Sequence, residues 1–309
     1  MSAAVPPTGR RLVVIYNPAK LADEQEFGGL LRDAAARHGW AAPILKPTTR
    51  TETGRGLVAE ALAGRAELVL AAGGDGTVRQ VSTALRNSGV PCGIIPIGTA
   101  NLLAQNMRIP LDVEQAIDLA LTGRPRTLDL ARLKVDRNRE VYFTGMAGIG
   151  FDAALMSDTD EKLKRIVGPA AYLVGFAKQL GTAPRRITVV VDDRLRIRRR
   201  AVLILVGNTG SLNRGIRLFP DAKPDDGRLD LLMAAPRSLG AWARLLRVVL
   251  RRIRRSSAVT YYAGRRFEIT LAEDTAWELD GDTEGRGRHF EFEVAAGALL
   301  LITPDDQRT

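Results

Sequence analysis

The chain has 309 residues, enough for two domains, and its hydrophobic content of 45% is that of a globular protein rather than a disordered one. The single cysteine, Cys92, excludes an intramolecular disulfide framework. No apolar run reaches the ~20 residues that span a bilayer, and the N-terminus lacks a hydrophobic signal core. A cytoplasmic protein is therefore expected. The net charge of +10 favours anionic partners, namely a nucleotide, a nucleic acid or an anionic membrane surface.

The first 126 residues alternate between strands and helices. Short apolar runs predict buried strands, and apolar residues at helical spacing predict amphipathic helices. The expected strands are residues 12–16, 42–45, 68–72 and 92–95, and the expected helices are 26–38, 56–63, 112–121 and one that starts at Thr77. This order indicates a doubly wound α/β domain with a mostly parallel sheet, whose ligands bind at the carboxyl ends of the strands.

A glycine turn separates the strand at 68–72 from the helix that begins at Thr77. Its residues are Gly73, Gly74, Asp75 and Gly76. The glycines let the backbone approach a ligand closely, and the free N–H groups of the following helix suit a phosphate. Asp75 would repel that phosphate unless a cation or a hydroxyl lay between them, which favours a metal-bound nucleotide. The alternative is a plain tight turn capped by Asp75.

A second turn of the same kind follows the strand at 92–95. Gly98 allows the bend, Thr99 offers a hydroxyl and an N–H group to a phosphate, and Asn101 can orient either. Both turns fall at strand carboxyl ends. The sequence contains no G-x-x-x-x-G-K-[ST] motif, so a P-loop is excluded.

The sequence GGDGT at 73–77, followed by PIGTANLLA at 96–104, resembles the diacylglycerol kinase catalytic domain superfamily, which includes bacterial lipid kinases, sphingosine kinases and ceramide kinases. GGDGT alone is shared with NAD kinases. The resemblance extends over nearly the whole chain and implies Mg-ATP as the phosphate donor. The nucleotide contacts that it implies are Asn17, Thr51, Gly73, Gly74, Asp75, Gly76, Thr77, Val78, Arg79 and Thr99.

Two of these contacts have simpler alternatives. Asn17 lies in an Asn-Pro turn, and Thr51 is one of several threonines placed to cap the helix that follows. Two other positions depart from the pattern of relatives. Leu102 stands where many of them have an aspartate, and Gln80 where a glutamate is frequent.

From Thr127 onward the pattern is dominated by strands. The expected strands are 128–135, 141–146, 187–191, 195–206, 229–233, 259–262, 266–271, 276–279, 290–294 and 299–303, with helices near 163–180 and 238–254. Paired strands across short turns indicate an antiparallel, sandwich-like domain. We therefore expect an α/β nucleotide domain at 1–126 and a β-sandwich domain for the lipid substrate at 127–309, whose last few residues return to the first domain. The resemblance implies a cleft between them.

Residues 148–153 fit G-x-G-x-x-A, the dinucleotide-binding fingerprint. The motif lies in the β-rich half without a regular βαβ unit around it, which argues against a Rossmann site. A similar glycine-rich stretch that ends in Phe-Asp is a feature of the family, where it lines the cleft.

Four carboxylates fall within ten residues of the turn at 219–230. Magnesium prefers oxygen ligands of this kind. By position, the resemblance implies a structural magnesium held by the carboxylate of Asp226 and by the carbonyl groups of Lys223 and Arg228. The alternatives are a solvated acidic turn, or a larger role for Asp221 or Asp230.

The stretch 277–284 resembles the Asp-Gly-Glu motif near the C-terminus of these kinases, whose glutamate is the general base. Here Asp282 stands at that place, and its shorter side chain must lie closer to the substrate hydroxyl. Asp280 would orient it or bind catalytic magnesium, and Glu284 is a second candidate for the base. The alternative is a polar hairpin tip, since Asp-Gly is a common turn pair.

The basic segment 238–255 has an apolar face and an arginine face. It is either an ordinary surface helix or one that lies on an anionic membrane. No nucleic-acid-binding motif is present. The sequence therefore predicts a lipid kinase, most simply one that converts diacylglycerol to phosphatidic acid at the inner membrane face. An NAD kinase-like enzyme and a decayed lipid or nucleotide sensor are the alternatives, and the oligomeric state stays open, a homodimer included.

Overall fold

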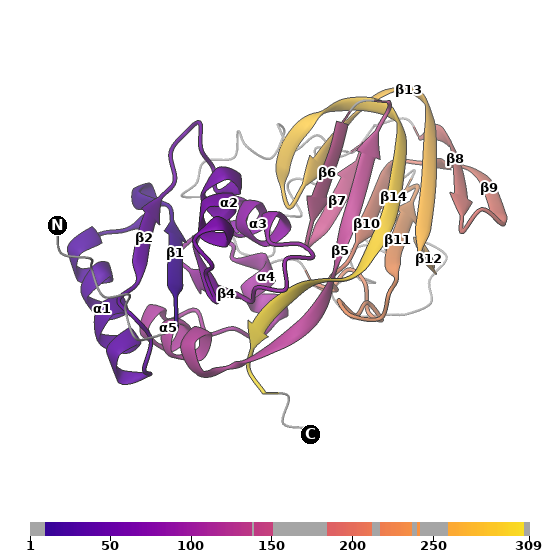
Figure 1. The fold of residues 1–309 in the computed structure, drawn as a ribbon. Helices are drawn as coiled ribbons and strands as arrows, with labels where there is room; N and C mark the ends of the chain where they lie inside the picture. Colours follow the sequence, from indigo (N-terminus) through magenta and orange to yellow (C-terminus); the bar gives the residue numbers. More distant parts are fainter. Residues whose placement is uncertain are drawn as a thin grey trace. The chain divides into compact units, whose positions relative to one another are not determined.

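The computed structural model describes residues 10–137, 139–150, 184–211, 217–236, 240–241 and 259–305. The expected helices at 163–180 and 238–254, and residues 151–153 of the glycine-rich motif, lie outside these ranges. The chain forms two compact units (Figure 1). Unit 1 comprises Met1–Leu128 and Gly297–Thr309, and unit 2 comprises Asp129–Ala296.

Unit 1 is built on a parallel sheet in the order β2-β1-β3-β4, with the end of β14 beside β4. These strands are β1 (Leu12–Tyr16), β2 (Ile44–Pro47), β3 (Leu68–Gly73), β4 (Cys92–Pro96) and the last residues of β14 (Asp282–Thr303). The helices are η1 (Pro18–Lys20), α1 (Glu24–Arg37), α2 (Arg55–Ala63), α3 (Asp75–Ala84), α4 (Leu102–Asn106) and α5 (Val113–Thr122). The predicted α/β architecture is confirmed.

The core of unit 1 follows from its uniformly apolar strands. Every residue of β1, β3 and β4 is buried. On one face of the sheet, alternate strand residues pack against apolar side chains of α1 and α5. The side chain of Asp23 caps α1 by accepting hydrogen bonds from the N–H groups of Gln25 and Glu26. Such full burial is expected of a parallel sheet covered by helices on both faces.

Unit 2 is an antiparallel β-structure. Its strands are β5 (Arg124–Val135), β6 (Arg139–Phe143), β7 (Met146–Ile149), β8 (Arg185–Val191), β9 (Leu195–Ala201), β10 (Leu203–Gly207), β11 (Leu229–Ala234), β12 (Val259–Gly264), β13 (Arg266–Leu279) and β14. The order β12-β11-β10-β7-β13-β14 forms the main path, with β8 paired to β13 and β9, and β5 paired to β14 and β6. Its core is rich in aromatic side chains, including Phe143, Phe267, Trp277, Phe290 and Phe292.

Two expected strands of unit 2 are each divided in the structure. The stretch 195–206 forms β9, which pairs with β8, and β10, which pairs with β7 and β11. The division falls at buried Val202, whose N–H group donates to the carbonyl of Ala234. The stretch 141–146 is divided into β6 and β7 at residues 144–145, where the carboxylate of Asp280 lies in the space that a Cβ atom on Gly145 would need.

Two other pairs of expected strands are each one long strand. The segments 266–271 and 276–279 both belong to β13, and 290–294 and 299–303 both belong to β14. The pairing of β13 with β14 shifts register between Thr270 and Thr275. Such an irregularity interrupts the alternation of apolar and polar residues, so the sequence pattern suggested a strand end.

Over the described ranges, no helix has the length and hydropathy needed to cross a membrane.

Candidate functional site

The predicted nucleotide contacts gather at the carboxyl edge of the parallel sheet in unit 1. Asn17 follows β1, Thr51 lies in the loop after β2, and the two glycine turns follow β3 and β4. The N–H group of Asn17 donates to the carbonyl of Ala72, near the end of β3, over 2.9 Å. This edge is where α/β sheets bind their ligands.

The N-terminus of α3 has the features of an anion site. Its cap residue is Gly74, and no side chain makes a capping hydrogen bond there. The N–H group of Val78 donates to the carbonyl of Gly74 over 3.0 Å, whereas the preceding N–H groups of Gly76 and Thr77 have no acceptor inside the helix. A Cβ atom added to Gly76 would meet nothing within 4 Å. Open space beside free N–H groups at the positive end of a helix suits a phosphate.

The two glycine turns are held against each other. A Cβ atom added to Gly98 would overlap the Cα atom of Gly74, so the backbones touch at these glycines. The carboxylate of Asp75 accepts hydrogen bonds from the N–H groups of Asn101 and Leu102, over 3.0 and 2.5 Å. The carboxylate therefore has backbone donors as partners, where the sequence suggested a cation or a hydroxyl. Asp75 joins the turns and stabilises the start of α4.

Asn101 holds the second turn in shape. Its φ of +50° lies in the left-handed region, which asparagine tolerates better than most residues. Its side-chain oxygen accepts from the N–H group of Gly98 over 3.0 Å, and its amide donates to the Gly98 carbonyl over 2.9 Å. Thr99, at the tip of this turn, is exposed. Both polar atoms of the Asn101 side chain are thus bonded to the backbone of Gly98, and they fix the backbone conformation around Thr99.

The structure places other predicted contacts in structural roles. The side chains of Val78 and Arg79 are buried in α3. The Asn17 side chain accepts from the N–H group of Ala19, as the turn alternative predicted. Thr51 is exposed, and its hydroxyl lies 3.2 Å from that of Thr49.

The alternative that a threonine caps α2 is wrong. The cap residue of α2 is Gly54, with no capping side-chain hydrogen bond of its own. Instead, the carboxylate of Glu52 accepts hydrogen bonds from the N–H groups of Gly54 and Gly56, over 2.8 and 3.1 Å. A carboxylate at a helix start also interacts favourably with the helix dipole. The hydroxyl of exposed Thr51 is therefore not required to start this helix.

The acidic turn of unit 2 is anchored by Asp129. Its carboxylate accepts from the N–H group of Gly227 over 2.7 Å, and its own N–H group donates to the carbonyl of Pro224 over 2.7 Å. One oxygen of Asp226 accepts from the N–H group of Arg228 over 3.0 Å. No group of three or more His, Cys, Asp or Glu side chains that could hold a metal occurs in the parts of the chain that the structure describes.

Negative charge is concentrated around Asp230, which follows the turn. Burial and, to a smaller extent, the nearby carboxylates of Asp226 and Asp221 raise the pKa of Asp230 to about 6, against the lowering effect of Arg228. Such repulsion among carboxylates is relieved by a cation. The oxygen donors of this turn therefore suit magnesium. Its carboxylates alone are too few to coordinate the ion, so backbone carbonyls would complete the ligands.

A second cluster of carboxylates lies at the tip between β13 and β14. Asp280 and Gly281 form the two-residue turn, with φ values of +51° and +94°, and Leu279 pairs with Asp282 across it. Asp280 is fixed against β7, because its carboxylate accepts from the N–H group of Met146 and its own N–H donates to the Met146 carbonyl, both over 2.9 Å. Asp282 is exposed. The tip thus holds one anchored carboxylate and one that faces solvent.

Glu278 is a functional candidate that the sequence analysis missed. It is buried in β13, opposite Gly148 of β7, and a Cβ atom added to that glycine would lie 2.5 Å from its Oε1 atom. Burial and, to a smaller extent, the charges of Asp280 and Asp282 raise the pKa of Glu278 to about 7. Such a carboxyl group can exchange protons near neutral pH. The available signal was a charged residue between Trp277 and Leu279, inside an apolar strand.

The raised pKa of Glu278 predicts a pH dependence of stability. In the unfolded chain the group ionises near 4.5, and in the folded protein near 7. Its contribution to the free energy of unfolding is therefore largest below pH 4.5, falls as the pH rises to 7, and is lost above that. The total change is about 3 kcal/mol. Urea unfolding in metal-free buffer, measured from pH 5 to 8, should show a smaller fall in Glu278→Gln than in the wild type, because the contribution of Asp230, whose pKa is also raised, remains in both proteins.

The matched control for this measurement is Glu273→Gln. Glu273 lies on the same strand but is exposed, so its replacement should leave the pH dependence of unfolding as in the wild type. If Glu278→Gln lost stability with rising pH as steeply as the wild type, the assigned pKa of Glu278 would be wrong.

Glu284, the second candidate for the base, has a structural partner. Its carboxylate forms an ion pair with Arg139, whose guanidinium lies 4.9 Å from the ring centroid of Trp277. The side chain of Glu284 is 17% exposed. An ion pair that also packs on an aromatic face holds the carboxylate in place. The geometry therefore favours Asp282 over Glu284 as proton acceptor.

Comparison with known proteins gives the family. The description "Diacylglycerol kinase catalytic domain" matches residues 11–133, and "YegS C-terminal NAD kinase beta sandwich-like domain" matches residues 145–303. A probable lipid kinase YegS-like protein of Klebsiella pneumoniae is 32% identical over 249 residues, covering 80% of this chain and 81% of that one. The chain belongs to the YegS-like lipid kinase family. A relative from Yersinia enterocolitica, with the same description, is 33% identical and covers 80% of this chain and 82% of its own.

Solved structures with the same fold confirm the architecture. A putative diacylglycerol kinase from Bacillus anthracis superposes with a TM-score of 0.78 at 19% identity, covering 99% of both chains. An NAD kinase from Archaeoglobus fulgidus, in complex with ATP, superposes with a TM-score of 0.52 at 13% identity, covering 96% of this chain and 94% of that one. The α/β and β-sandwich domains predicted from the sequence are therefore confirmed, and the resemblance to the superfamily is confirmed with them.

Proposed function

We propose that this protein transfers the γ-phosphate of ATP to the hydroxyl group of a lipid, most simply converting diacylglycerol to phosphatidic acid. The observation that carries the proposal is the uncapped start of α3, with open space at Gly76, joined through Asp75 to a second glycine turn. Membership of a lipid kinase family supports a lipid as acceptor. The ATP in the Archaeoglobus fulgidus NAD kinase supports ATP as the donor.

Each unit has one part of the chemistry in this proposal. In unit 1, the backbone around Gly73, Gly74, Gly76, Thr77 and Thr99 holds the phosphates. In unit 2, the Asp282 carboxylate accepts the proton as the lipid O–H bond breaks and the new O–P bond forms. The bond between the γ-phosphorus and the bridging oxygen breaks at the same time, and ADP leaves. Positioning and electrostatic stabilisation supply most of the rate in such transfers.

Magnesium enters the proposal in two places. ATP is bound as its magnesium complex, and the ion offsets charge on the phosphate oxygens. A structural ion would be held by the carboxylate of Asp226 with the carbonyl groups of Lys223 and Arg228, at the turn that Asp129 anchors. Asp280, which the sequence resemblance allowed as a magnesium ligand, instead has the Met146 backbone as its partner, so we propose that it positions Asp282.

The proposal is tested by incubating the protein with ATP labelled at the γ-phosphate and a panel of lipids in mixed micelles, with and without EDTA. NAD is included as an alternative acceptor. We expect label in diacylglycerol, and none when EDTA removes magnesium. Label in another lipid only would keep the reaction and replace the acceptor. An absence of transfer to any lipid, with ATP still bound, would reject the enzyme and favour a sensor.

An NAD kinase-like activity is the second candidate. The fold similarity to a yeast NADH kinase, with a TM-score of 0.55 at 10% identity, and the NAD kinase-like description of the C-terminal domain are the observations in its favour. Label in NAD alone would establish it.

The lipid acceptor also implies work at a membrane, so we propose that the protein acts at the anionic inner face of the cytoplasmic membrane, with no nucleic acid partner.

A further inference from the structure

The hairpin of β8 and β9 carries an unusual density of arginine. Seven arginines fall between residues 185 and 200. Cross-strand partners share one face of a hairpin. The register therefore places Arg186 beside Arg200, and puts Arg198 and Arg196 on the same face, opposite Thr188 and Val190. We call the face formed by these six residues the arginine face.

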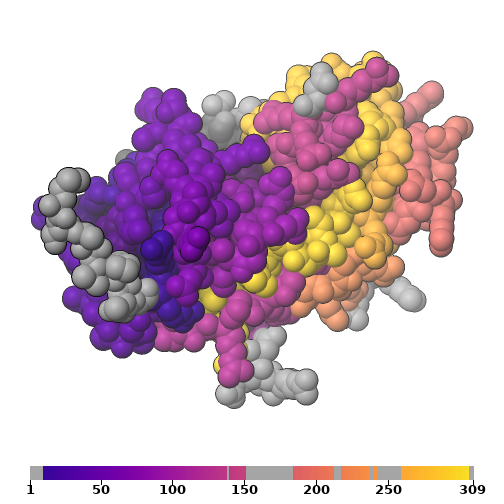
Figure 2. All heavy atoms as spheres, in the orientation of Figure 1, coloured from indigo at the N-terminus to yellow at the C-terminus, as the bar shows by residue number. Residues whose placement is uncertain are grey.

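The other face of the hairpin packs against the protein. Ile187, Val189 and Val191 of β8 are buried in the core of unit 2, and β8 is paired with β13 from Ile187 to Val191. All four arginines of the arginine face are exposed. Figure 2 shows the hairpin at the molecular surface, in the salmon colour that lies between magenta and orange on the bar. The core therefore fixes the hairpin with the arginine face toward solvent.

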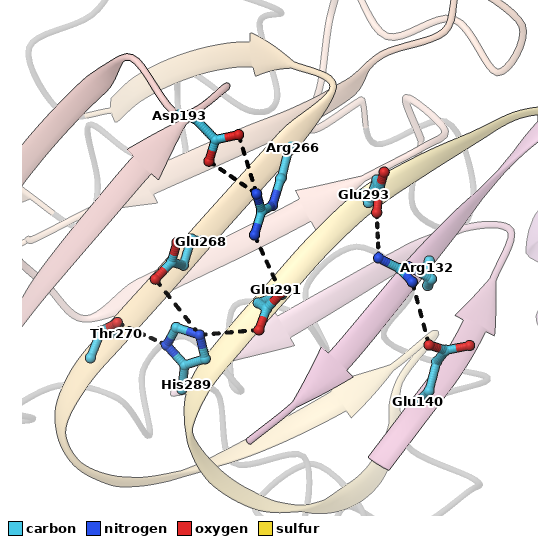
Figure 3. A network of polar contacts seen from close by, with 9 residues as sticks. All are labelled: Arg132, Glu140, Asp193, Arg266, Glu268, Thr270, His289, Glu291 and Glu293. Atoms are coloured by element: carbon cyan, nitrogen blue, oxygen red, sulfur yellow. Dashed lines mark hydrogen bonds and ion pairs between the residues drawn. The ribbon is translucent and has the colours of Figure 1, made fainter. Parts of the chain in front are cut away.

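The acidic residues of the hairpin do not neutralise these arginines. One oxygen of Asp192 accepts from the N–H groups of Arg265 and Arg266, over 2.7 and 2.9 Å. Asp193 forms an ion pair with the Arg266 side chain over 3.0 Å, and Arg266 also pairs with Glu291 (Figure 3). Both turn carboxylates thus bind β13. Within the described ranges, none of the four arginines on the arginine face forms an ion pair or a side-chain hydrogen bond with another residue.

This arrangement costs stability unless something outside the chain is bound. Like charges directly opposite each other on paired strands, such as Arg186 and Arg200, destabilise the pair. An edge strand gains protection from a charge or two, but that role does not require four arginines on one face. An external surface with many negative charges would relieve the repulsion. Arginine suits phosphate groups well, because its guanidinium donates two parallel hydrogen bonds.

The side chains of the arginine face favour a bilayer over a nucleic acid. Leu195, at the hairpin tip, is 48% exposed but pairs with Val191, so it lies on the opposite face of the hairpin. The arginine face itself offers guanidinium groups, which suit the phosphates of a lipid surface. Readers of nucleic acid usually add aromatic or amide side chains that contact bases, and the arginine face has none.

We propose that the arginine face is the surface that docks the protein on an anionic phospholipid bilayer. The inference deepens the proposed function and rests on it for the location of the substrate. The arginines contact the phosphates of the lipid headgroups. Docking of this kind brings the enzyme to a bilayer-resident lipid.

The test is vesicle binding without ATP. The variant Arg196→Glu/Arg198→Glu/Arg200→Glu keeps the edge strand charged but reverses its sign. Each basic residue near an anionic surface contributes about fivefold to binding, so we expect the affinity for vesicles of phosphatidylcholine and phosphatidylglycerol to fall about 100-fold. Sedimentation with these vesicles measures it, and vesicles of phosphatidylcholine alone should bind neither protein strongly. The matched control Arg32→Glu/Arg124→Glu/Arg137→Glu makes the same change in net charge at exposed arginines elsewhere, and should bind almost as the wild type.

A second variant separates charge from folding. Arg196→Lys/Arg198→Lys/Arg200→Lys should retain most of the binding, and all variants should melt within a few degrees of the wild type. An equal loss in the control, or unchanged binding by the Glu variant, would overturn the proposal. The proposal would also be overturned if the wild type bound duplex DNA more tightly than vesicles and the Glu variant lost that binding. The vesicle test measures no turnover, so it can be separated from the test of the proposed function. If the wild type binds the vesicles but transfers no phosphate, the proposed function alone is rejected. If it transfers phosphate to a micellar lipid but binds vesicles equally well with and without these arginines, this inference alone is rejected.

Discussion

Replacing Asp282 by asparagine is expected to lower kcat about 10²- to 10⁴-fold, the range that general base catalysis supplies, while ATP binding and stability stay as in the wild type. Asparagine has the same size and can accept a hydrogen bond, but it cannot take a proton from the lipid hydroxyl. Asp282 is exposed at a hairpin tip, so the substitution removes no packing. Label transfer from ATP to the lipid measures turnover, and calorimetric titration with an ATP analogue measures binding.

Glu278→Gln is the discriminating control for this prediction. Glu278 is a nearby carboxyl group whose pKa of about 7 would also suit a base. If Asp282 is the base, Glu278→Gln should retain much of the activity and mainly alter its pH profile. Full activity in Asp282→Asn with loss in Glu278→Gln would transfer the role to Glu278. Loss in both variants, with normal melting temperatures, would mean that the carboxylates share the proton.

The position of the glycine turns was predictable, whereas the partners of their side chains were not. An apolar run that ends in glycine and is followed by a helical pattern is a local signal, and the structure places β3, the turn and α3 accordingly. The hydrogen bonds of Asp75 reach residues 26 and 27 positions further along the chain. No local pattern specifies such a contact. The sequence could therefore show where a phosphate would bind, but not what neutralises Asp75.

The glycine-rich motif at 148–153 is a case in which a local pattern suggested a site but the glycines have another explanation. Its spacing fits a dinucleotide fingerprint, but in the structure Gly148 leaves room for the Glu278 carboxylate, as Gly145 does for that of Asp280. Glu278 lies in β13 and Asp280 in the turn that follows it, both more than a hundred residues away in the sequence. These glycines are explained by the approach of acidic side chains from a neighbouring strand, and a motif match based on spacing alone does not contain that information.

Gly98→Ala is expected to lower both the stability of the protein and its affinity for ATP. The added methyl group would overlap the Gly74 backbone and lie 2.8 Å from Oδ1 of Asn101. The backbone overlap cannot be relieved by a side-chain rotation, so the turns must separate, at a cost of about 1–3 kcal/mol in the free energy of unfolding. Separation also moves the N–H groups that contact phosphate, each worth about 1.5–3 kcal/mol, so ATP should bind at least about tenfold more weakly.

Gly76→Ala separates the two effects. A methyl group at this position meets no protein atom within 4 Å, and alanine favours a helix by about 0.5–1 kcal/mol over glycine, so the melting temperature should stay unchanged or rise. If a phosphate occupies that open space, the same methyl group must weaken ATP binding. Denaturant unfolding and ATP titration on both variants distinguish the two glycines: Gly98 holds the turns together, and Gly76 leaves the ligand its room. Unchanged ATP affinity in a stable Gly76→Ala protein would place the phosphates elsewhere.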